Sequence, residues 1–125
     1  MKKLLKKAID VRNNAYTPYS NFKVGALVID ENNNEYVGVN VENGSFGLTN
    51  CAERTAIFSG ITSGMKKINV LVVVANTTEP VSPCGACRQV MSEFSDEKTI
   101  IILGNTNMDY KVMDINEILP YRFKL

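Results

Sequence analysis

The segment from residue 68 to residue 75, INVLVVVA, constrains the fold more than any other part of the chain. Its longest apolar stretch, residues 70–75, is far shorter than the roughly 20 residues that a membrane span needs. A continuous β-branched run of this length is typical of a strand that is covered on both faces. Helices packed on both faces of a sheet provide such cover. The run therefore predicts an α/β fold with the sheet in the middle.

The other elements are predicted from apolar periodicity and from turn and capping residues. Apolar residues at helical spacing predict an N-terminal helix that ends by residues 13 and 14. Further helices are predicted over residues 51–63, over 84–94, and in a short segment that begins at the capping-box-like pair Asp114 and Glu117. Strands are predicted over residues 22–30, 35–43, 68–75, 99–103 and 110–113. The pattern is that of a single domain, residues 1–125, with a mixed five-stranded sheet flanked by helices.

Composition narrows the range of partners and compartments. The 14 basic and 13 acidic residues give a formal charge of +1, so no strong field attracts nucleic acid or an anionic membrane. The basic N-terminus is not followed by the apolar segment of a signal peptide. An odd number of cysteines without an export signal favours reduced thiols over a disulfide framework. We therefore expect a cytoplasmic protein with a small-molecule substrate and no nucleic-acid or membrane partner.

All three cysteines lie in two short segments, Cys51 in CAER (51–54) and Cys84 and Cys87 in PCGACR (83–88). Three thiolates fill three corners of a zinc tetrahedron and leave the fourth for water, which is typical of a catalytic site. Both segments lie at predicted helix starts, where unpaired N–H groups favour thiolates. Glu53 follows the first ligand by two residues and can carry protons to and from that water. The pattern predicts a hydrolase with one zinc ion per chain.

The residues around the cysteines support this interpretation over two simpler ones. Three thiolates and one Zn²⁺ sum to −1, so a compensating cation is expected, and Arg54 is favoured as a donor to the ligand sulfurs. Arg88 fits such a donor and an ordinary surface residue equally well. A Cys-x-x-Cys pair alone also fits a redox dithiol or half of a structural zinc site. The first leaves Cys51 unexplained, and the second lacks a fourth ligand because the chain has no other cysteine and no histidine.

The sequence resembles the small homo-oligomeric cytidine deaminases from Tyr16 to Pro120. The densest matches are NVEN (40–43), TNCAERTA (49–56) and VSPCGACRQ (81–89). A ligand-x-Glu motif followed by Pro-Cys-x-x-Cys is the signature of zinc deaminases. The resemblance implies a three-layer α/β/α fold, a homotetramer, and hydrolysis of cytidine and deoxycytidine to uridine and deoxyuridine with release of ammonia, a reaction of pyrimidine salvage.

The resemblance also implies roles for individual residues. Glu53 is the catalytic residue, and Cys51, Cys84 and Cys87 hold the zinc. The residues expected to bind substrate are Phe22, Asn40, Glu42, Ala52, Ser82 and, from a neighbouring subunit, Phe123. Asn40 and Glu42 are two apart on a predicted strand, so they are expected to share one face and to bind a ribose hydroxyl.

Two positions depart from the family pattern, and three other functions share parts of it. Phe46 stands where relatives commonly have tyrosine, and Tyr121 replaces the glycine of a Leu-Pro-Gly-x-Phe motif. The closest alternative is a blasticidin-type nucleoside deaminase, although NVEN and CAER favour the cytidine branch. A polynucleotide-editing deaminase needs a groove for phosphates, which the near-zero charge disfavours. The non-enzymatic alternative is a zinc-stabilised interaction module.

Overall fold

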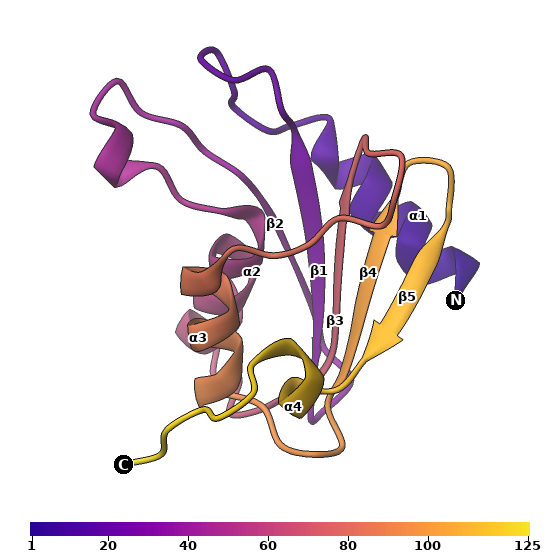
Figure 1. Cartoon of the computed structure of the whole chain (residues 1–125), viewed down its shortest axis with the longest axis vertical. Helices are drawn as coiled ribbons and strands as arrows, with labels where there is room; N and C mark the ends of the chain where they lie inside the picture. The colour runs from indigo at the N-terminus through magenta and orange to yellow at the C-terminus, as the bar shows by residue number, and fades with distance from the viewer.

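The computed structural model describes all 125 residues and has one central sheet with helices on both faces (Figure 1). The sheet order is β2-β1-β3-β4-β5. The strands are β1 (Val24–Asp30), β2 (Glu35–Val39), β3 (Ile68–Ala75), β4 (Ile100–Asn105) and β5 (Tyr110–Met113). The helices are α1 (Lys2–Arg12), α2 (Ala52–Thr62), α3 (Gly85–Glu93) and α4 (Ile115–Ile118), with a 3₁₀ turn η1 (Phe46–Leu48). Only β3 and β4 pair in parallel, so the predicted mixed five-stranded sheet is confirmed.

The central strand β3 is covered on both faces, as its sequence predicts. Val72 and Val74 pack in a cluster with Leu5 of α1. Leu71 and Val73 point to the opposite face and join the larger core that includes residues of α2, α3 and α4. All five side chains are fully buried. Because successive side chains of a strand point to opposite faces of the sheet, the eight residues of β3 pack against the helices on both faces. The three-layer α/β/α arrangement is confirmed.

The predicted extension of β2 to Asn43 is wrong. The strand ends at Val39, and β1 begins at Val24 rather than at Phe22. The cause is the side chain of Asn40, whose Oδ1 accepts from the Val24 N–H at 2.9 Å and whose Nδ2 donates to the Phe22 carbonyl at 2.8 Å. These two bonds occupy backbone groups at the start of β1, so a side-chain amide competes successfully with regular strand pairing.

Two loops that are distant in sequence lie side by side at one end of the sheet (Figure 1). Residues 13–23 join α1 to β1, and residues 40–51 join β2 to α2. Tyr16 connects them: its N–H donates to the Asn40 carbonyl at 3.0 Å, and its carbonyl accepts from the Glu42 N–H at 2.9 Å. The second loop leads directly to the start of α2. None of the helices combines the length and the apolarity that a membrane crossing requires.

Candidate active site and metal centre

The three cysteines converge at the starts of two neighbouring helices. Cys51 is the N-cap of α2, and Cys84 is the N-cap of α3, where its sulfur accepts from the N–H of Cys87 at 3.4 Å. The three sulfurs all lie within 4.8 Å of one another, and those of Cys51 and Cys84 are 3.8 Å apart. Tetrahedral ligands about 2.3 Å from zinc would be separated by about 3.8 Å. The three thiols therefore fit one zinc ion.

Electrostatics within the cluster favour the thiolate form of Cys51. Hydrogen bonding from Cys87, then from Arg54 and Cys84, lowers the pKa of Cys51 to about 5, although burial acts in the opposite direction. Arg54 Nη2 lies 3.2 Å from the Cys51 sulfur. The pKa of Cys87, in contrast, is raised by the hydrogen bond between Cys87 and Cys51 and by the burial of Cys87. The cation that the sequence places next to the ligands thus lies against the Cys51 sulfur and favours its thiolate form.

Glu53 lies in the first turn of α2, with only 4% of its surface exposed. Burial raises the pKa of its carboxyl, and its own backbone N–H acts in the opposite direction. Glu53 lines a cavity of about 190 Å³ together with Cys51 and Cys84. A carboxyl with a raised pKa beside a metal-binding cluster is suited to accept and return protons.

The same cavity gathers four of the predicted substrate-binding residues. Its walls include Phe22, Asn40, Ala52 and Ser82, which come from four separate parts of the chain. Phe22 is 43% exposed, whereas Ala52 is fully buried. The Asn40 side chain is held in place by its two bonds to the backbone of Phe22 and Val24. The structure thus brings these residues together around the metal cluster.

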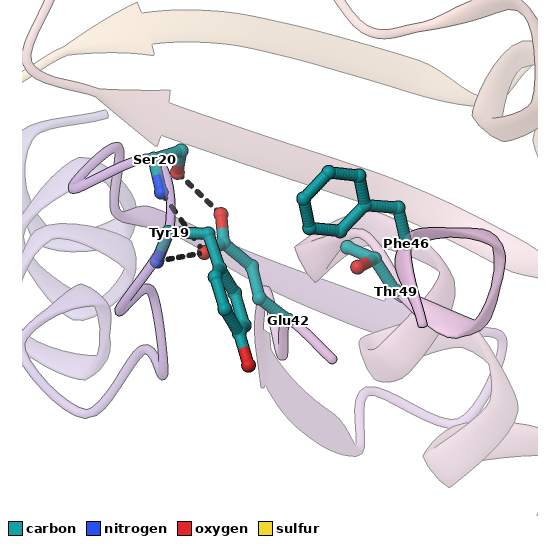
Figure 2. A pocket seen from close by; sticks show the side chains of 5 residues that line it. All are labelled: Tyr19, Ser20, Glu42, Phe46 and Thr49. Carbon is teal, nitrogen blue, oxygen red and sulfur yellow. Dashed lines mark hydrogen bonds between the residues drawn. The ribbon is translucent and has the colours of Figure 1, made fainter. Parts of the chain in front are cut away.

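Glu42 does not share this cavity. It lines a neighbouring pocket of about 370 Å³ with Tyr19, Ser20, Phe46 and Thr49 (Figure 2). Glu42 Oε1 accepts from the N–H groups of Tyr19 and Ser20 at 3.0 and 3.1 Å, and the Ser20 hydroxyl bonds to the other oxygen. The Ser20 hydroxyl contributes most to lowering the pKa of the Glu42 carboxyl, while burial opposes the shift. The expectation that Asn40 and Glu42 share one strand face is wrong, because β2 ends before both.

Phe123 also lies outside the metal cavity of its own chain. It is 65% exposed and lines a surface pocket of about 300 Å³ with residues of α3 and the C-terminal segment. Nothing within one chain brings it close to the zinc ligands.

Arg88 makes contacts that sequence reasoning missed. Its guanidinium donates to the Ser82 hydroxyl at 2.7 Å, to the Pro83 carbonyl at 2.9 Å and to the Ile118 carbonyl at 3.2 Å. The only signal in the sequence is its position, four residues after Cys84, which places it over the loop before α3.

Comparison with known proteins decides the family. Residues 1–103 match the model of the cytidine and deoxycytidylate deaminase zinc-binding region. The chain belongs to the cytidine and deoxycytidylate deaminase family. It is 47% identical to the cytidine deaminase of Halalkalibacterium halodurans over 120 residues, which cover 96% of this chain and 91% of that one. It is 49% identical to the cytidine deaminase of Mycoplasma genitalium, covering 88% and 85% of the two chains.

Solved structures of this deaminase family have the same fold. A crystal structure of cytidine deaminase from Burkholderia pseudomallei superposes with a TM-score of 0.93 at 43% identity, covering 98% of each chain. The cytidine deaminase of Mycobacterium tuberculosis gives 0.84 at 31% identity, covering 99% of this chain and 97% of that one. Together with the sulfur geometry, family membership confirms zinc as the cofactor of Cys51, Cys84 and Cys87. The roles of the individual substrate-binding residues remain predictions.

Proposed function

We propose that this chain hydrolyses cytidine and deoxycytidine to uridine and deoxyuridine with release of ammonia. The observation that carries the proposal is the arrangement of three cysteine sulfurs at zinc-ligand spacing beside a buried glutamate in one small cavity. A volume of about 190 Å³ is below the roughly 300–1,000 Å³ typical of sites for drug-sized ligands. It suits a single heterocyclic ring, with the sugar at the mouth of the cavity.

The metal is held by Cys51, Cys84 and Cys87, each as a thiolate. Zinc held there would supply Lewis acidity, which makes a water molecule easier to deprotonate. The negative charge of three thiolates weakens this Lewis acidity. Arg54 offsets part of that negative charge through its contact with Cys51. Reduced thiols are required for this ligand set, which agrees with a cytoplasmic location.

Glu53 moves the protons of the reaction. It takes a proton from the attacking water and delivers it to the ring nitrogen next to C4, which makes C4 electrophilic. It then carries the second proton of the water to the departing amine, so that ammonia leaves and the carbonyl of uridine forms. Burial excludes bulk water from the carboxyl and keeps these transfers between Glu53 and the substrate.

The walls of the cavity orient the base. Phe22 packs against the pyrimidine ring, the Ala52 N–H and the Ser82 carbonyl bond to its polar edge, and Asn40 faces the ribose. Glu42, whose carboxylate is already ordered by Tyr19 and Ser20, binds the sugar where it leaves the cavity. These assignments rest on the gathering of the residues around the metal and on the family resemblance.

The active form is a homotetramer in which Phe123 covers the site of a neighbouring subunit. Large apolar side chains support this association because they are exposed in the single chain, among them Phe46 at 74% and Leu48 at 70% on the loop before α2. Mixing a Glu53→Ala chain with a Phe123→Ala chain tests the arrangement. If Phe123 acts across the interface, mixed oligomers regain activity that neither variant has alone; additive activities would contradict it.

The test of the proposed function is the ultraviolet absorbance of cytidine incubated with zinc-quantified protein, with deoxycytidine and blasticidin S in parallel. We expect absorbance in the cytidine band to fall with both cytidine and deoxycytidine. Turnover of blasticidin S alone would assign the chain to the other branch of nucleoside deaminases. No change with any of the three, at one zinc per chain, would leave the metal site in place and overturn the substrate class.

A further inference from the structure

Arg88 joins three segments that meet beside the metal cavity. Two of its acceptors, the Ser82 hydroxyl and the Pro83 carbonyl, belong to the two residues that immediately precede the zinc ligand Cys84. The third acceptor is the carbonyl of Ile118, the last residue of α4. The side chain of Ile118 is nearly fully buried in the core, at 2% exposure. One guanidinium therefore ties a loop at the active site to an element that the core holds in place.

Only an arginine can make this set of contacts at this position. Helical side chains lean toward the N-terminus of their helix, so Arg88, four residues after Cys84, reaches back over the loop that leads into α3. Its three bonds use Nε, Nη1 and Nη2, which are the separate arms of a planar fork. A lysine carries its donors on one nitrogen and cannot reach acceptors in three directions at these distances.

The loop that Arg88 holds faces the cavity. Ser82 lines the space that also contains Glu53, Cys51 and Cys84. Its hydroxyl is the group bound by Arg88, so its position relative to the cavity depends on that bond. We propose that Arg88 is a positioning residue that fixes the Ser82 carbonyl where it accepts a hydrogen bond from the amino group of the pyrimidine.

This inference rests on the proposed function and makes it more specific. The amino group of cytidine can donate to the Ser82 carbonyl, whereas uridine carries an oxygen at that place and cannot. A loop released from Arg88 therefore loses affinity for cytidine and not for uridine. A purely structural role would weaken both ligands together or change stability alone.

The experiment compares Arg88→Gln, Arg88→Lys and Ser82→Ala with wild type, each measured per zinc-loaded chain. Arg88→Gln is expected to raise the KM for cytidine about tenfold and to change kcat less than threefold. The inhibition constant of uridine is expected to change less than twofold. Arg88→Lys should not restore the KM, because one ammonium cannot replace three directed bonds. Ser82→Ala keeps the backbone carbonyl and removes only the tether, so it should raise the KM about threefold.

The double variant tests whether the two residues act together. If Arg88 works through Ser82, adding Ser82→Ala to Arg88→Gln causes no further rise in KM. The control is Lys67→Gln, which removes the 2.6 Å ion pair between Lys67 and Asp96. Lys67 directly precedes the first residue of β3, so this variant should leave the KM unchanged.

The outcomes separate this inference from the proposed function. An unchanged KM in Arg88→Gln, equal losses for cytidine and uridine, or additive effects in the double variant would overturn the positioning role. If Arg88→Gln does not fold, Ser82→Ala decides alone: a raised KM at constant uridine inhibition supports the role, and an unchanged KM overturns it. Absence of cytidine turnover in the wild type would overturn the proposed function itself.

Discussion

Substitution of Gly38 by alanine should move the catalytic helix while leaving every catalytic residue in the sequence. Gly38 lies in β2 where this strand packs against α2. A Cβ atom added there would meet the backbone nitrogen of Ala56 and lie 2.5 Å from the Ala52 carbonyl oxygen and 3.0 Å from the Ala56 Cα. All three obstacles are backbone atoms of α2, so no rotation of a side chain can relieve the clash.

The magnitude follows from these distances. Ordinary contacts of a Cβ atom begin at 3.4 Å, so α2 must retreat from β2 by about 1 Å. Overpacking usually costs about 1–3 kcal/mol, and we expect the upper end here because the obstructing atoms all belong to the α2 backbone. The helix begins next to Cys51 and carries Glu53 in its first turn. A displacement of about 1 Å at a reacting group can lower the rate about 100-fold.

The assay combines urea unfolding with the rate of cytidine deamination. Gly38→Ala should lower the free energy of unfolding by about 3 kcal/mol and kcat/KM about 100-fold. Gly25→Ala is the matched control, since its Cβ would meet the Ala8 carbonyl of α1 and lie 2.9 Å from the Arg12 Cβ, on the other face of the sheet. It should lose comparable stability and keep its activity while folded. Activity of Gly38→Ala within twofold of wild type would refute this reasoning.

Three further outcomes are expected. Cys87→Ala should lose zinc and part of the stability, because metal binding and folding are linked, and metal analysis with thermal unfolding checks both. Burial raises the pKa of Asp30, but hydrogen bonds from Asn34 and Asn32 outweigh it and hold this pKa below its ordinary 3.8. The ionised Asp30 carboxylate therefore stabilises the folded chain above that pH, and this stabilisation is lost as the pH falls below it. The stability difference between wild type and Asp30→Asn, measured by urea unfolding, should therefore shrink from pH 6 to pH 3. Tyr121 is fully exposed and has a φ of 57°, which is strained for a residue with a side chain. Tyr121→Gly should release about 1–2 kcal/mol of this backbone strain and lose about 0.5–1 kcal/mol through the greater entropy of the unfolded chain. The melting temperature should therefore rise slightly.

The fold and the metal ligands could be predicted because their signals are local. The run from Ile68 to Ala75 predicts a strand covered on both faces, and β3 has these bounds. The capping pair Asp114 and Glu117 predicts the start of α4, where both of its hydrogen bonds form. The spacing of the cysteines predicts ligands at two helix starts, and the sulfurs meet there.

The remaining features depend on contacts between distant segments. The side chain of Asn40 ends two strands by bonding to the backbone of Phe22 and Val24, which no periodicity reveals. Arg88 donates a hydrogen bond to the carbonyl of Ile118, thirty residues further along the chain. Tyr121 has a left-handed backbone, a conformation that glycine suits better, so the sequence shows the departure from the family motif and only the structure shows the conformation that Tyr121 adopts there.

The most direct measurement for the central claim is zinc content and cytidine turnover of Glu53→Gln. The amide has nearly the same shape as the carboxyl and cannot accept the proton, so the variant should fold and bind one zinc per chain. Its stability should not fall, because a neutral group costs less to bury than a carboxylate. Turnover should fall by at least about 10²–10⁴-fold, the range for one general acid–base group. Zinc-loaded Glu53→Gln with turnover within tenfold of wild type would contradict the account.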